Sequence, residues 1–195
     1  KLITDVDLVD EVWSERPSIS HEPAFIYDEE YCGESRASKL ARLRSAMGDC
    51  QHHIITSLDD IVWLFNIRGN DVDCNPVVLS YALINQDNAI LYVQDNVVDV
   101  KTEAILKRDS IIIRAYNDIY EDVKKLTGKV LLDDQIVNYQ IFNNLNCEIK
   151  TAPNPTQHFK AIKNETEIKA TKNAHIKDGV AMTKFMYWLK NNVGK

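Results

Sequence analysis

The chain has 195 residues, of which 45% are hydrophobic and 27% are charged, a balance typical of soluble globular proteins. Its formal net charge of -6 argues against a nucleic-acid partner, because binding a polyphosphate backbone normally calls for a dense basic face. No run of about 18 apolar residues is present in the sequence, which excludes a membrane-spanning helix and argues against a membrane partner.

The first 30 residues predict the tail of a preceding domain followed by a linker. Pro17 and Pro23 lie there among polar residues. One short apolar pattern is present, and it consists of Val6, Leu8, Val9, Val12 and Trp13. The chain begins with Lys1 rather than Met and lacks the apolar core of a signal peptide, so we expect it to be a piece of a longer protein.

Two helices separated by a short strand are predicted next. Ser38 is expected to cap a helix that ends near residue 48, and residues 52–56 are expected to form the strand. Ser57 and Asp60 approximate a capping box that starts the second helix, which Gly69 could end.

Residues 77–150 predict a mixed sheet with helices against it. The runs VVLSYALI and AILYV, separated by a turn-like stretch at 85–88, indicate a hairpin. Helices and strands then alternate, with a helix at 100–107, a strand at 111–115, a helix opening at Asn117, a strand at 129–133, a helix at about 135–144 and a strand near Cys147. Such alternation is typical of an α/β layer structure, which we place at residues 31–158.

A long amphipathic helix is predicted after the break at Pro153 and Pro155. Asn164 and Glu167 have the spacing of a helix cap. The apolar residues that follow recur at helical spacing, and they are Ala174, Ala181, Met182, Phe185, Met186, Leu189 and Val193. A helix of up to roughly 45 Å is long for a small domain, so residues 159–195 are interpreted as the first element of a following domain. We expect the chain beyond about residue 160 to protrude or to pack on a neighbour.

The four cysteines are far apart and show no CxxC or Cys/His pairing at zinc spacing; they are Cys32, Cys50, Cys74 and Cys147. We interpret them as reduced thiols of a cytoplasmic protein, with an extracellular disulfide pair as the alternative.

Four blocks in a fixed order resemble the long, three-domain Xaa-Pro aminopeptidases, metallopeptidases of the creatinase and prolidase superfamily. LVDEVWSERP resembles the end of the family's first domain, and YCGESRASKLARLRSAM the start of its second. SLDDIVWLFNIRGNDVDCNP with VVLSYALI is similar to the centre of that domain. FKAIKNETEIKATKNAHIKDGVAMTKFMYWL is similar to the helix that enters the catalytic pita-bread domain. Together the blocks cover nearly the whole chain.

The resemblance implies a creatinase N-terminal-like middle domain, with the long helix starting a pita-bread domain. In the family that catalytic domain holds two divalent ions, usually manganese, on two Asp, one His and two Glu, and the ions activate water to cleave before a penultimate proline. Those ligands fall after the long helix. The resemblance therefore implies no catalytic, cofactor-binding or metal-binding residue in this chain, which we predict to be inactive by itself. Its implied partners are the remaining domains, a second copy in a homodimer, and the peptide substrate.

Two groups of residues that could hold a metal ion have a structural interpretation instead. Glu167, His175 and Asp178 could share a helix face, but Glu167 and His175 are separated by roughly 12 Å of rise, so a polar strip is favoured over a shared ion. His52 and His53 should point to opposite faces of a strand, which favours one buried, hydrogen-bonded histidine.

Carboxylate pairs were interpreted in the same way. Asp59 and Asp60 suit the first turn of a helix and Asp133 and Asp134 a strand end, rather than an acid/base dyad. The acidic stretch with Asp71 and Asp73, next to Asn70 and Asn75, lacks the Gly and terminal Glu of an EF-hand.

Two further side chains have a structural and a functional interpretation. Arg68 could brace the loop that contains Asp71 and Asp73 or reach across a domain interface, and substrate contact is the alternative. Trp63 is interpreted as a core anchor, with a ligand platform as the alternative.

Two functions remain open from sequence. The first is the noncatalytic middle domain of an Xaa-Pro aminopeptidase. The second is a noncatalytic creatinase-like scaffold that binds proteins, of the kind found in the large subunit of the FACT histone chaperone. The ordered ligands Asp, Asp, His, Glu and Glu further along the parent protein would distinguish them in favour of the enzyme.

Overall fold

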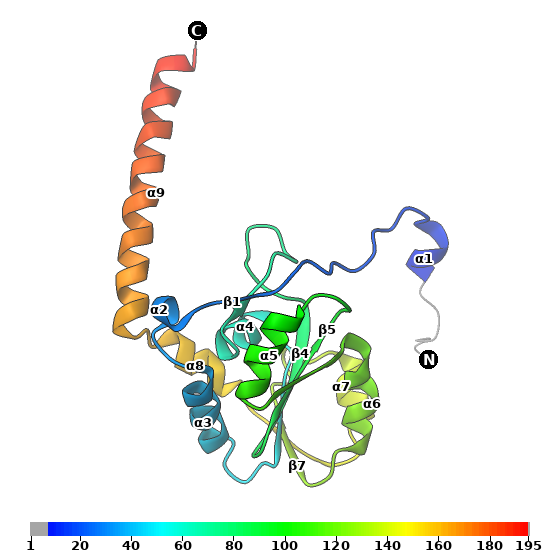
Figure 1. Ribbon diagram of the computed structural model, residues 1–195. Helices are drawn as coiled ribbons and strands as arrows, with labels where there is room; N and C mark the ends of the chain where they lie inside the picture. The colour runs from blue at the N-terminus through cyan, green and yellow to red at the C-terminus, as the bar shows by residue number, and fades with distance from the viewer. Residues whose placement is uncertain (1–7, 195) are drawn as a thin grey trace.

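The computed structural model describes residues 8–194 and has a six-stranded mixed sheet at its centre (Figure 1). The strands lie in the order β6 (Ile111–Ala115), β5 (Ala89–Val93), β4 (Ser80–Asn85), β2 (His52–Ile55), β7 (Lys129–Leu132) and β8 (Glu148–Thr151). β4 is antiparallel to both of its neighbours, whereas the β5–β6, β2–β7 and β7–β8 pairs are parallel. The predicted hairpin and the predicted mixed sheet are confirmed.

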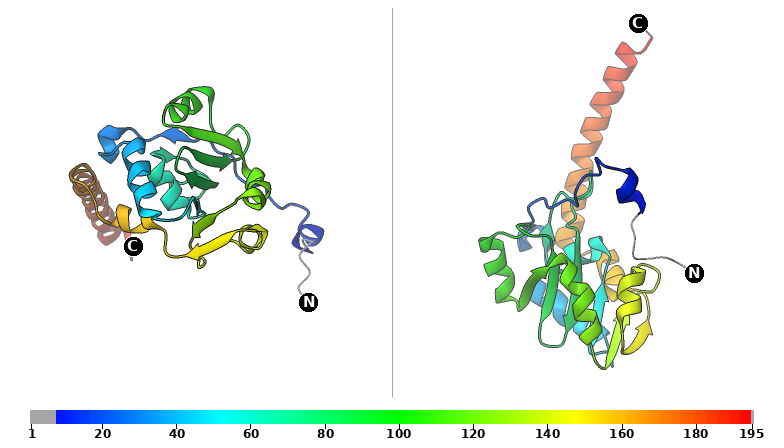
Figure 2. Two further views of the ribbon diagram at one scale, coloured as in Figure 1. Left: turned by 90° about the horizontal axis from the view of Figure 1, so that it is seen from below. Right: turned by 90° about the vertical axis from the view of Figure 1, so that its right-hand side faces the viewer.

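Helices cover both faces of this sheet (Figure 2). One core lies between the sheet and the helices α3 (Arg36–Ala46), α4 (Leu58–Leu64) and α5 (Val100–Arg108), and it contains Leu43, Phe65 and Ile84 without exposed surface. The other core lies against α6 (Ile119–Asp122), which is flanked by single 3-10 turns at Tyr116–Asp118 and Val123–Lys125, and against α7 (Tyr139–Asn144). Two apolar layers explain why the central strands read as nearly continuous apolar runs.

The N-terminal segment crosses one end of the sandwich that the sheet and its two helical layers form. It comprises α1 (Leu8–Val12), an extended stretch, β1 (Phe25–Ile26) and α2 (Glu29–Cys32). β1 pairs antiparallel with β3 (Ile67–Arg68), and Ala24 N donates to Val97 O at 2.8 Å. Val6 of the predicted apolar pattern lies outside the described residues.

The predicted start of α4 at Ser57 is confirmed, whereas the cap of α3, the capping bond of Ser57 and the end of α4 differ from prediction. The cap of α3 is Ser35, whose side-chain oxygen accepts from Ser38 N at 3.2 Å. The side chain of Ser57 makes no capping bond at α4. That helix ends before Gly69, because Asn66 takes a φ of 48° and turns the chain into β3. Left-handed backbone of this kind ends a helix, and Asn tolerates it better than most residues.

The C-terminal part departs from prediction at two places. α7 begins at Tyr139 rather than near 135. An additional helix, α8 (Pro155–Ala161), starts at the predicted proline break, since Pro155 occupies the first turn where its missing N–H costs nothing. The boundary expected between residues 158 and 159 falls inside this helix.

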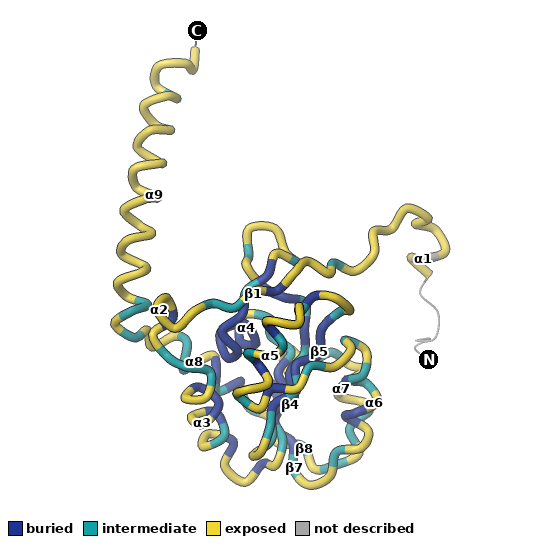
Figure 3. Tube along the Cα trace, viewed as in Figure 1, coloured by how far each residue is buried: buried dark blue, intermediate teal, exposed yellow. Residues whose placement is uncertain are grey.

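α9 (Glu165–Asn192) projects away from the domain (Figures 1 and 3). Its 28 residues correspond to about 42 Å. The predicted Asn164–Glu167 cap is confirmed as a reciprocal capping box. The expectation that the chain protrudes beyond residue 160 is also confirmed. Across residues 8–194, the hydropathy of the helices falls short of what a bilayer crossing requires.

Candidate functional site at the base of the long helix

The first turn of α9 is attached to the domain by its own capping residues. Asn164 Oδ1 accepts from Glu167 N at 2.9 Å, while Asn164 Nδ2 donates to Cys32 O at 2.8 Å. Glu167 Oε2 accepts from Asn164 N at 2.9 Å, while Glu167 Oε1 accepts from Trp63 Nε1 at 3.3 Å. The residues that start the helix therefore also fix its direction relative to α2 and α4.

Gly33 allows the close approach of this joint. It follows α2 with a φ of +70°. A Cβ atom built on Gly33 would lie 2.7 Å from Asn164 Oδ1 and 2.7 Å from Thr166 Cβ. Both the backbone conformation and the available space thus require glycine at this position.

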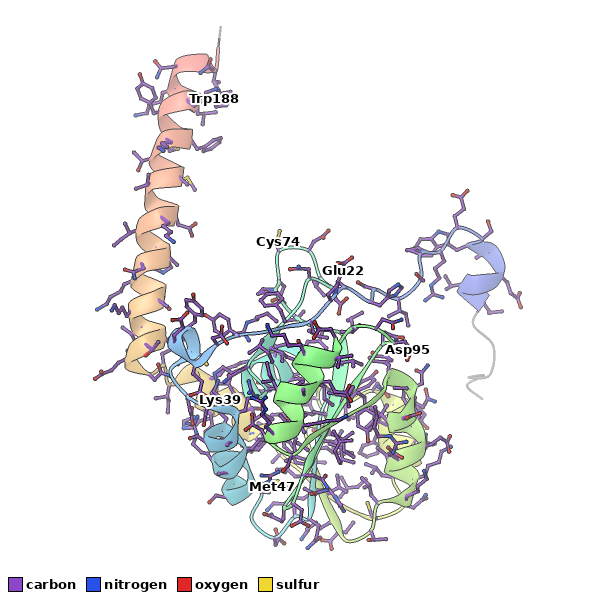
Figure 4. The ribbon with its side chains drawn as sticks, viewed as in Figure 1. Glu22, Lys39, Met47, Cys74, Asp95 and Trp188 are labelled. Carbon is purple, nitrogen blue, oxygen red and sulfur yellow. The ribbon has the colours of Figure 1, made fainter. Side chains whose placement is uncertain are left out.

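Lys39 supports the joint from below (Figure 4). Its side chain is buried, and Nζ donates to Trp63 O at 2.9 Å and to Asn66 Oδ1 at 2.7 Å. Nζ also lies 4.2 Å from the centre of a Trp63 ring. Burial lowers the pKa of the Lys39 ammonium. The predicted role of Trp63 as a core anchor is confirmed, and its anchor includes a buried cation.

Two adjoining hollows, here called the Arg68 groove, lie beside this joint. One measures about 270 Å³ and the other about 250 Å³, and they share Trp63, Arg68 and Lys160. The remaining lining residues of the first are Tyr27, Tyr31, Cys32, Lys163, Glu167, Ala170 and Thr171, and those of the second are Asp59, Val62, Asn75, Pro76 and Val77. The groove thus runs from α9 past α4 to the loop after Gly69.

Arg68 is held by main-chain oxygens and an aromatic ring. Its Nη1 donates to Val62 O at 2.9 Å and to Ile67 O at 2.7 Å. The guanidinium lies over the Tyr27 ring at 4.4 Å from its centre. Burial lowers the pKa of Arg68. The hypothesis that Arg68 braces its loop through Asp71 and Asp73 is wrong, because neither carboxylate bonds to it.

Asp71 instead fastens the N-terminal segment to the loop after β3. Its Oδ1 accepts from Ser20 Oγ at 2.6 Å and from Glu22 N at 3.1 Å, and its Oδ2 accepts from Leu79 N at 2.7 Å. Figure 4 shows Glu22 beneath the loop that carries Cys74. Because both oxygens of Asp71 accept hydrogen bonds from these two segments, the carboxylate holds the loop in place.

Asp59 and Asp60 lie in the first turn of α4, as predicted, and Asp60 is buried in the domain. It is fully buried, and its Oδ2 accepts from Asn154 Nδ2 at 3.1 Å. Lys160 Nζ lies 2.9 Å from Asp60 Oδ1, which ties α8 to α4. The neighbouring Asp59 is exposed at the rim of the Arg68 groove.

The other residues considered as site candidates do not come together at one site. His53 is fully buried and its Nδ1 lies 3.0 Å from Leu131 O, so Nδ1 carries the proton and donates. Burial lowers the pKa of His53 to about 4. His52 is half-buried, which lowers the pKa of its ring as well. The prediction of one buried, hydrogen-bonded histidine is confirmed.

Asp133 and Asp134 directly follow β7, where a strand end was predicted. Asp133 Oδ1 accepts from Gln135 N at 3.1 Å and its Oδ2 from Gln157 Nε2 at 3.4 Å, so this buried carboxylate links the strand end to α8. Asp134 is exposed.

The conditions for a metal centre are not met within residues 8–194. No group of three or more His, Cys, Asp or Glu side chains in this range could hold an ion. Glu167 belongs to the capping box, whereas His175 and Asp178 are exposed on α9. All four cysteines are free thiols, and Cys74 is the exposed one.

α9 presents large apolar side chains that the other described residues leave uncovered. Met182 is 60% exposed, Phe185 51% and Trp188 56%, values that would be unusual for core residues. Figure 3 shows exposed surface along almost the whole helix, and Figure 4 places Trp188 near its far end. Met182 and Phe185 belong to the predicted apolar stripe, and both are exposed on α9.

A family model described as the creatinase/prolidase N-terminal domain matches residues 15–167. The chain belongs to this family. It is 33% identical to a probable Xaa-Pro aminopeptidase P of Neurospora crassa and 34% identical to one of Talaromyces stipitatus, over 96% of this chain in each case. It covers only 30% and 31% of those proteins, so it spans about a third of the relatives that it matches.

A solved structure agrees closely with this creatinase/prolidase N-terminal domain. The X-prolyl aminopeptidase of Caenorhabditis elegans superimposes with a TM-score of 0.88 over 97% of this chain at 29% identity. The matched region is 33% of that enzyme, which is described as cytosolic with a di-nuclear active site. The predicted family and fold are thereby confirmed.

Sequence reasoning missed several residues that build the site. Lys39 precedes Leu40 in an amphipathic helix and therefore reads as a solvated residue. Asn154 gave no signal, because its partner Asp60 is 94 residues away. Asn66, between Phe65 and Ile67 in an apolar run, could have indicated a left-handed turn.

Proposed function

We propose that this chain is the noncatalytic middle domain of an Xaa-Pro aminopeptidase. The observation that carries the proposal is the match to the nematode enzyme, which spans 97% of this chain with a TM-score of 0.88. The chain covers 33% of that enzyme, so the catalytic residues would be supplied by another part of the protein. No residue of the chain is proposed as a catalytic group or a metal ligand.

The proposed role is to hold the catalytic domain in a fixed place. Residues 31–158 would form the middle domain, and residues from 159 onward would lead into the catalytic domain. α8 makes that connection continuous, because Lys160 and Asn154 both contact Asp60 of α4. The apolar face of α9, which includes Phe185 and Trp188, would pack against the catalytic domain.

The remaining attributes of the parent enzyme are proposed from its relatives. Two divalent ions, with manganese as the expected metal, would activate water in the catalytic domain. The substrate would be a peptide with a penultimate proline, and the enzyme would act in the cytoplasm as a homodimer. The nematode relative is described as a cytosolic enzyme with a di-nuclear site, which supports the compartment and the number of ions.

The test compares this chain with the longer protein that contains it. The 195-residue chain with manganese should release no N-terminal residue from an Xaa-Pro peptide, whereas the longer protein should do so. Turnover by the chain alone would contradict the assignment of roles. Absence of the ordered Asp, Asp, His, Glu and Glu ligands from the longer protein would favour the protein-binding scaffold instead.

A further inference from the structure

We propose that the Arg68 groove binds peptides through a carboxylate, which Arg68 and Lys163 receive beside the rings of Tyr27 and Trp63. This inference concerns the surface of the chain itself and does not depend on the proposed peptidase role.

Arg68 has unused hydrogen-bond donors, and its guanidinium is held in a fixed position. Both of its hydrogen bonds within residues 8–194 are made by Nη1, to Val62 O and Ile67 O. Its Nε and Nη2 donate to no atom in that part of the chain. The stacking on Tyr27 and the two carbonyl contacts hold the guanidinium in place. A guanidinium whose orientation is set in advance binds a carboxylate with little loss of side-chain entropy.

The groove has two cations, Arg68 and Lys163, that form no ion pair within residues 8–194. Lys160 is paired with the buried Asp60 at 2.9 Å. Lys163 lines the groove, is exposed, and has no ion pair or hydrogen bond within the described residues. Glu167 also lines the groove, and its two oxygens accept hydrogen bonds from Trp63 and from Asn164, so they are not bonded to Arg68. Arg68 and Lys163 therefore offer two cations with unused donors, in a groove that also holds the carboxylates of Glu167 and Asp59.

The shape and the walls of the groove favour a peptide over a small inorganic anion. Trp63, Arg68 and Lys160 border both hollows, so a ligand that contacts Arg68 can reach either of them. Apolar and aromatic side chains line both ends, with Tyr31 at one end and Pro76 and Val77 at the other. Such walls suit the side chains that flank an acidic residue in an extended segment.

Two peptide pairs test the proposal by isothermal titration calorimetry and by amide chemical-shift mapping of the 195-residue chain. The first pair is acetyl-Gly-Phe-Asp-Phe-Gly-amide and the same peptide with Asn in place of Asp. The second pair is acetyl-Gly-Phe-Phe as free acid and as amide. We expect a dissociation constant on the order of 0.1–1 mM for a charged member and about tenfold weaker binding of its neutral counterpart. Binding of only one pair would support the proposal and assign the carboxylate to a side chain or to a chain terminus.

Matched variants locate the binding site. Lys163→Gln should weaken binding of the charged peptide about two- to fivefold. Lys177→Gln removes the same charge further along α9, away from the groove, and should change binding less than about 1.5-fold. Arg68→Lys keeps the charge but loses the planar fork, so at least a fivefold loss of binding is expected, together with a lower thermal stability because Lys cannot reproduce both main-chain hydrogen bonds of Arg68.

Three results would overturn the proposal. They are equal affinities within both peptide pairs, equal effects of Lys163→Gln and Lys177→Gln, and chemical-shift changes that avoid the groove. If Arg68→Lys fails to fold, the Lys163 comparison decides, because Lys163 is exposed and its side chain has no ion pair or hydrogen bond within residues 8–194.

Discussion

The sandwich of residues 24–162 and the helix α9 contain similar apolar residues but treat them in opposite ways. Phe65 in the sandwich has no exposed surface, whereas Phe185 on α9 is 51% exposed. In the sandwich, two helical layers close on one sheet, so each apolar side chain meets residues from distant parts of the chain. α9 is stabilised within residues 8–194 by its own backbone hydrogen bonds and by the joint at its first turn. Helical periodicity alone therefore does not say whether an apolar stripe is already buried or still awaits a partner.

The largest expected effect separates the two phenylalanines. Phe65→Ala should destabilise the chain by about 3–5 kcal/mol, because it opens a cavity in a closed core. Phe185→Ala should change the free energy of unfolding by no more than about 0.5 kcal/mol, because its ring leaves no cavity. Urea unfolding followed by tryptophan fluorescence measures both. Similar losses for the two variants would mean that α9 is covered in solution, for example by a second copy.

The two regions also differ in the burial of their histidines, and the pH dependence of stability measures that difference. His53 is buried, and its pKa is lowered to about 4 from an unfolded value of about 6.5. The unfolded chain therefore binds a proton more readily than the folded chain between these values. The stability contributed by neutral His53 is fully present above pH 6.5 and is lost as the pH falls towards 4. The equilibrium constant for unfolding should rise by at most about tenfold per pH unit in this window.

Urea midpoints between pH 7 and pH 4 test this dependence. His53→Gln should flatten the slope, whatever its own effect on stability. His175→Gln, on the exposed surface of α9, serves as the matched control and should leave the slope as it is in the unaltered chain. An unchanged slope in His53→Gln would show that other groups cause the acid sensitivity.

The joint between the two regions is expected to depend on Gly33. Gly33→Ala places a Cβ atom 2.7 Å from Asn164 Oδ1 and Thr166 Cβ, in addition to the strain of a φ of +70°. Gly48→Ala is the matched control, since Gly48 has a φ of +61° but open space where the Cβ would lie. The strain common to both should cost about 1–2 kcal/mol, and the contact with α9 should add to it only at Gly33.

A pair of spin labels, one on the sandwich and one on α9, measures the separate effect on the joint. Gly33→Ala should broaden the distance distribution between them, whereas Gly48→Ala should leave it narrow. If both distributions stay narrow, the capping residues hold α9 without the close approach at Gly33.

Local sequence patterns predict most of the helices and strands. The contacts that attach α8 and α9 to the rest of the domain do not follow from such patterns. The hairpin, α5, β6 and the Asn164–Glu167 cap depend on neighbours within a few residues, so propensity and spacing predicted them. Asp60 looked like a helix-start carboxylate, although its partners Asn154 and Lys160 come from a helix about a hundred positions later. Arg68 was expected to bond to nearby acids, but the carbonyls of Val62 and Ile67 are better placed. Contacts at such sequence separations follow from the topology of the sheet, which a single sequence does not specify.

The smallest expected effect concerns the two ends of α9. Asn164→Ala removes the cap and the bond to Cys32 O, and should cost about 1 kcal/mol. Asn191 lies at the other end, where its Nδ2 donates to Tyr187 O at 2.7 Å on an exposed surface. Asn191→Ala should therefore leave the free energy of unfolding nearly unchanged.

Hydrogen exchange shows which part of α9 loses protection in each variant. Asn164→Ala should speed exchange of the amides of residues 165–170, while Asn191→Ala should affect only the last turn. Equal protection of the first turn in both variants would mean that packing against α2 and Trp63, rather than the cap, fixes where α9 begins.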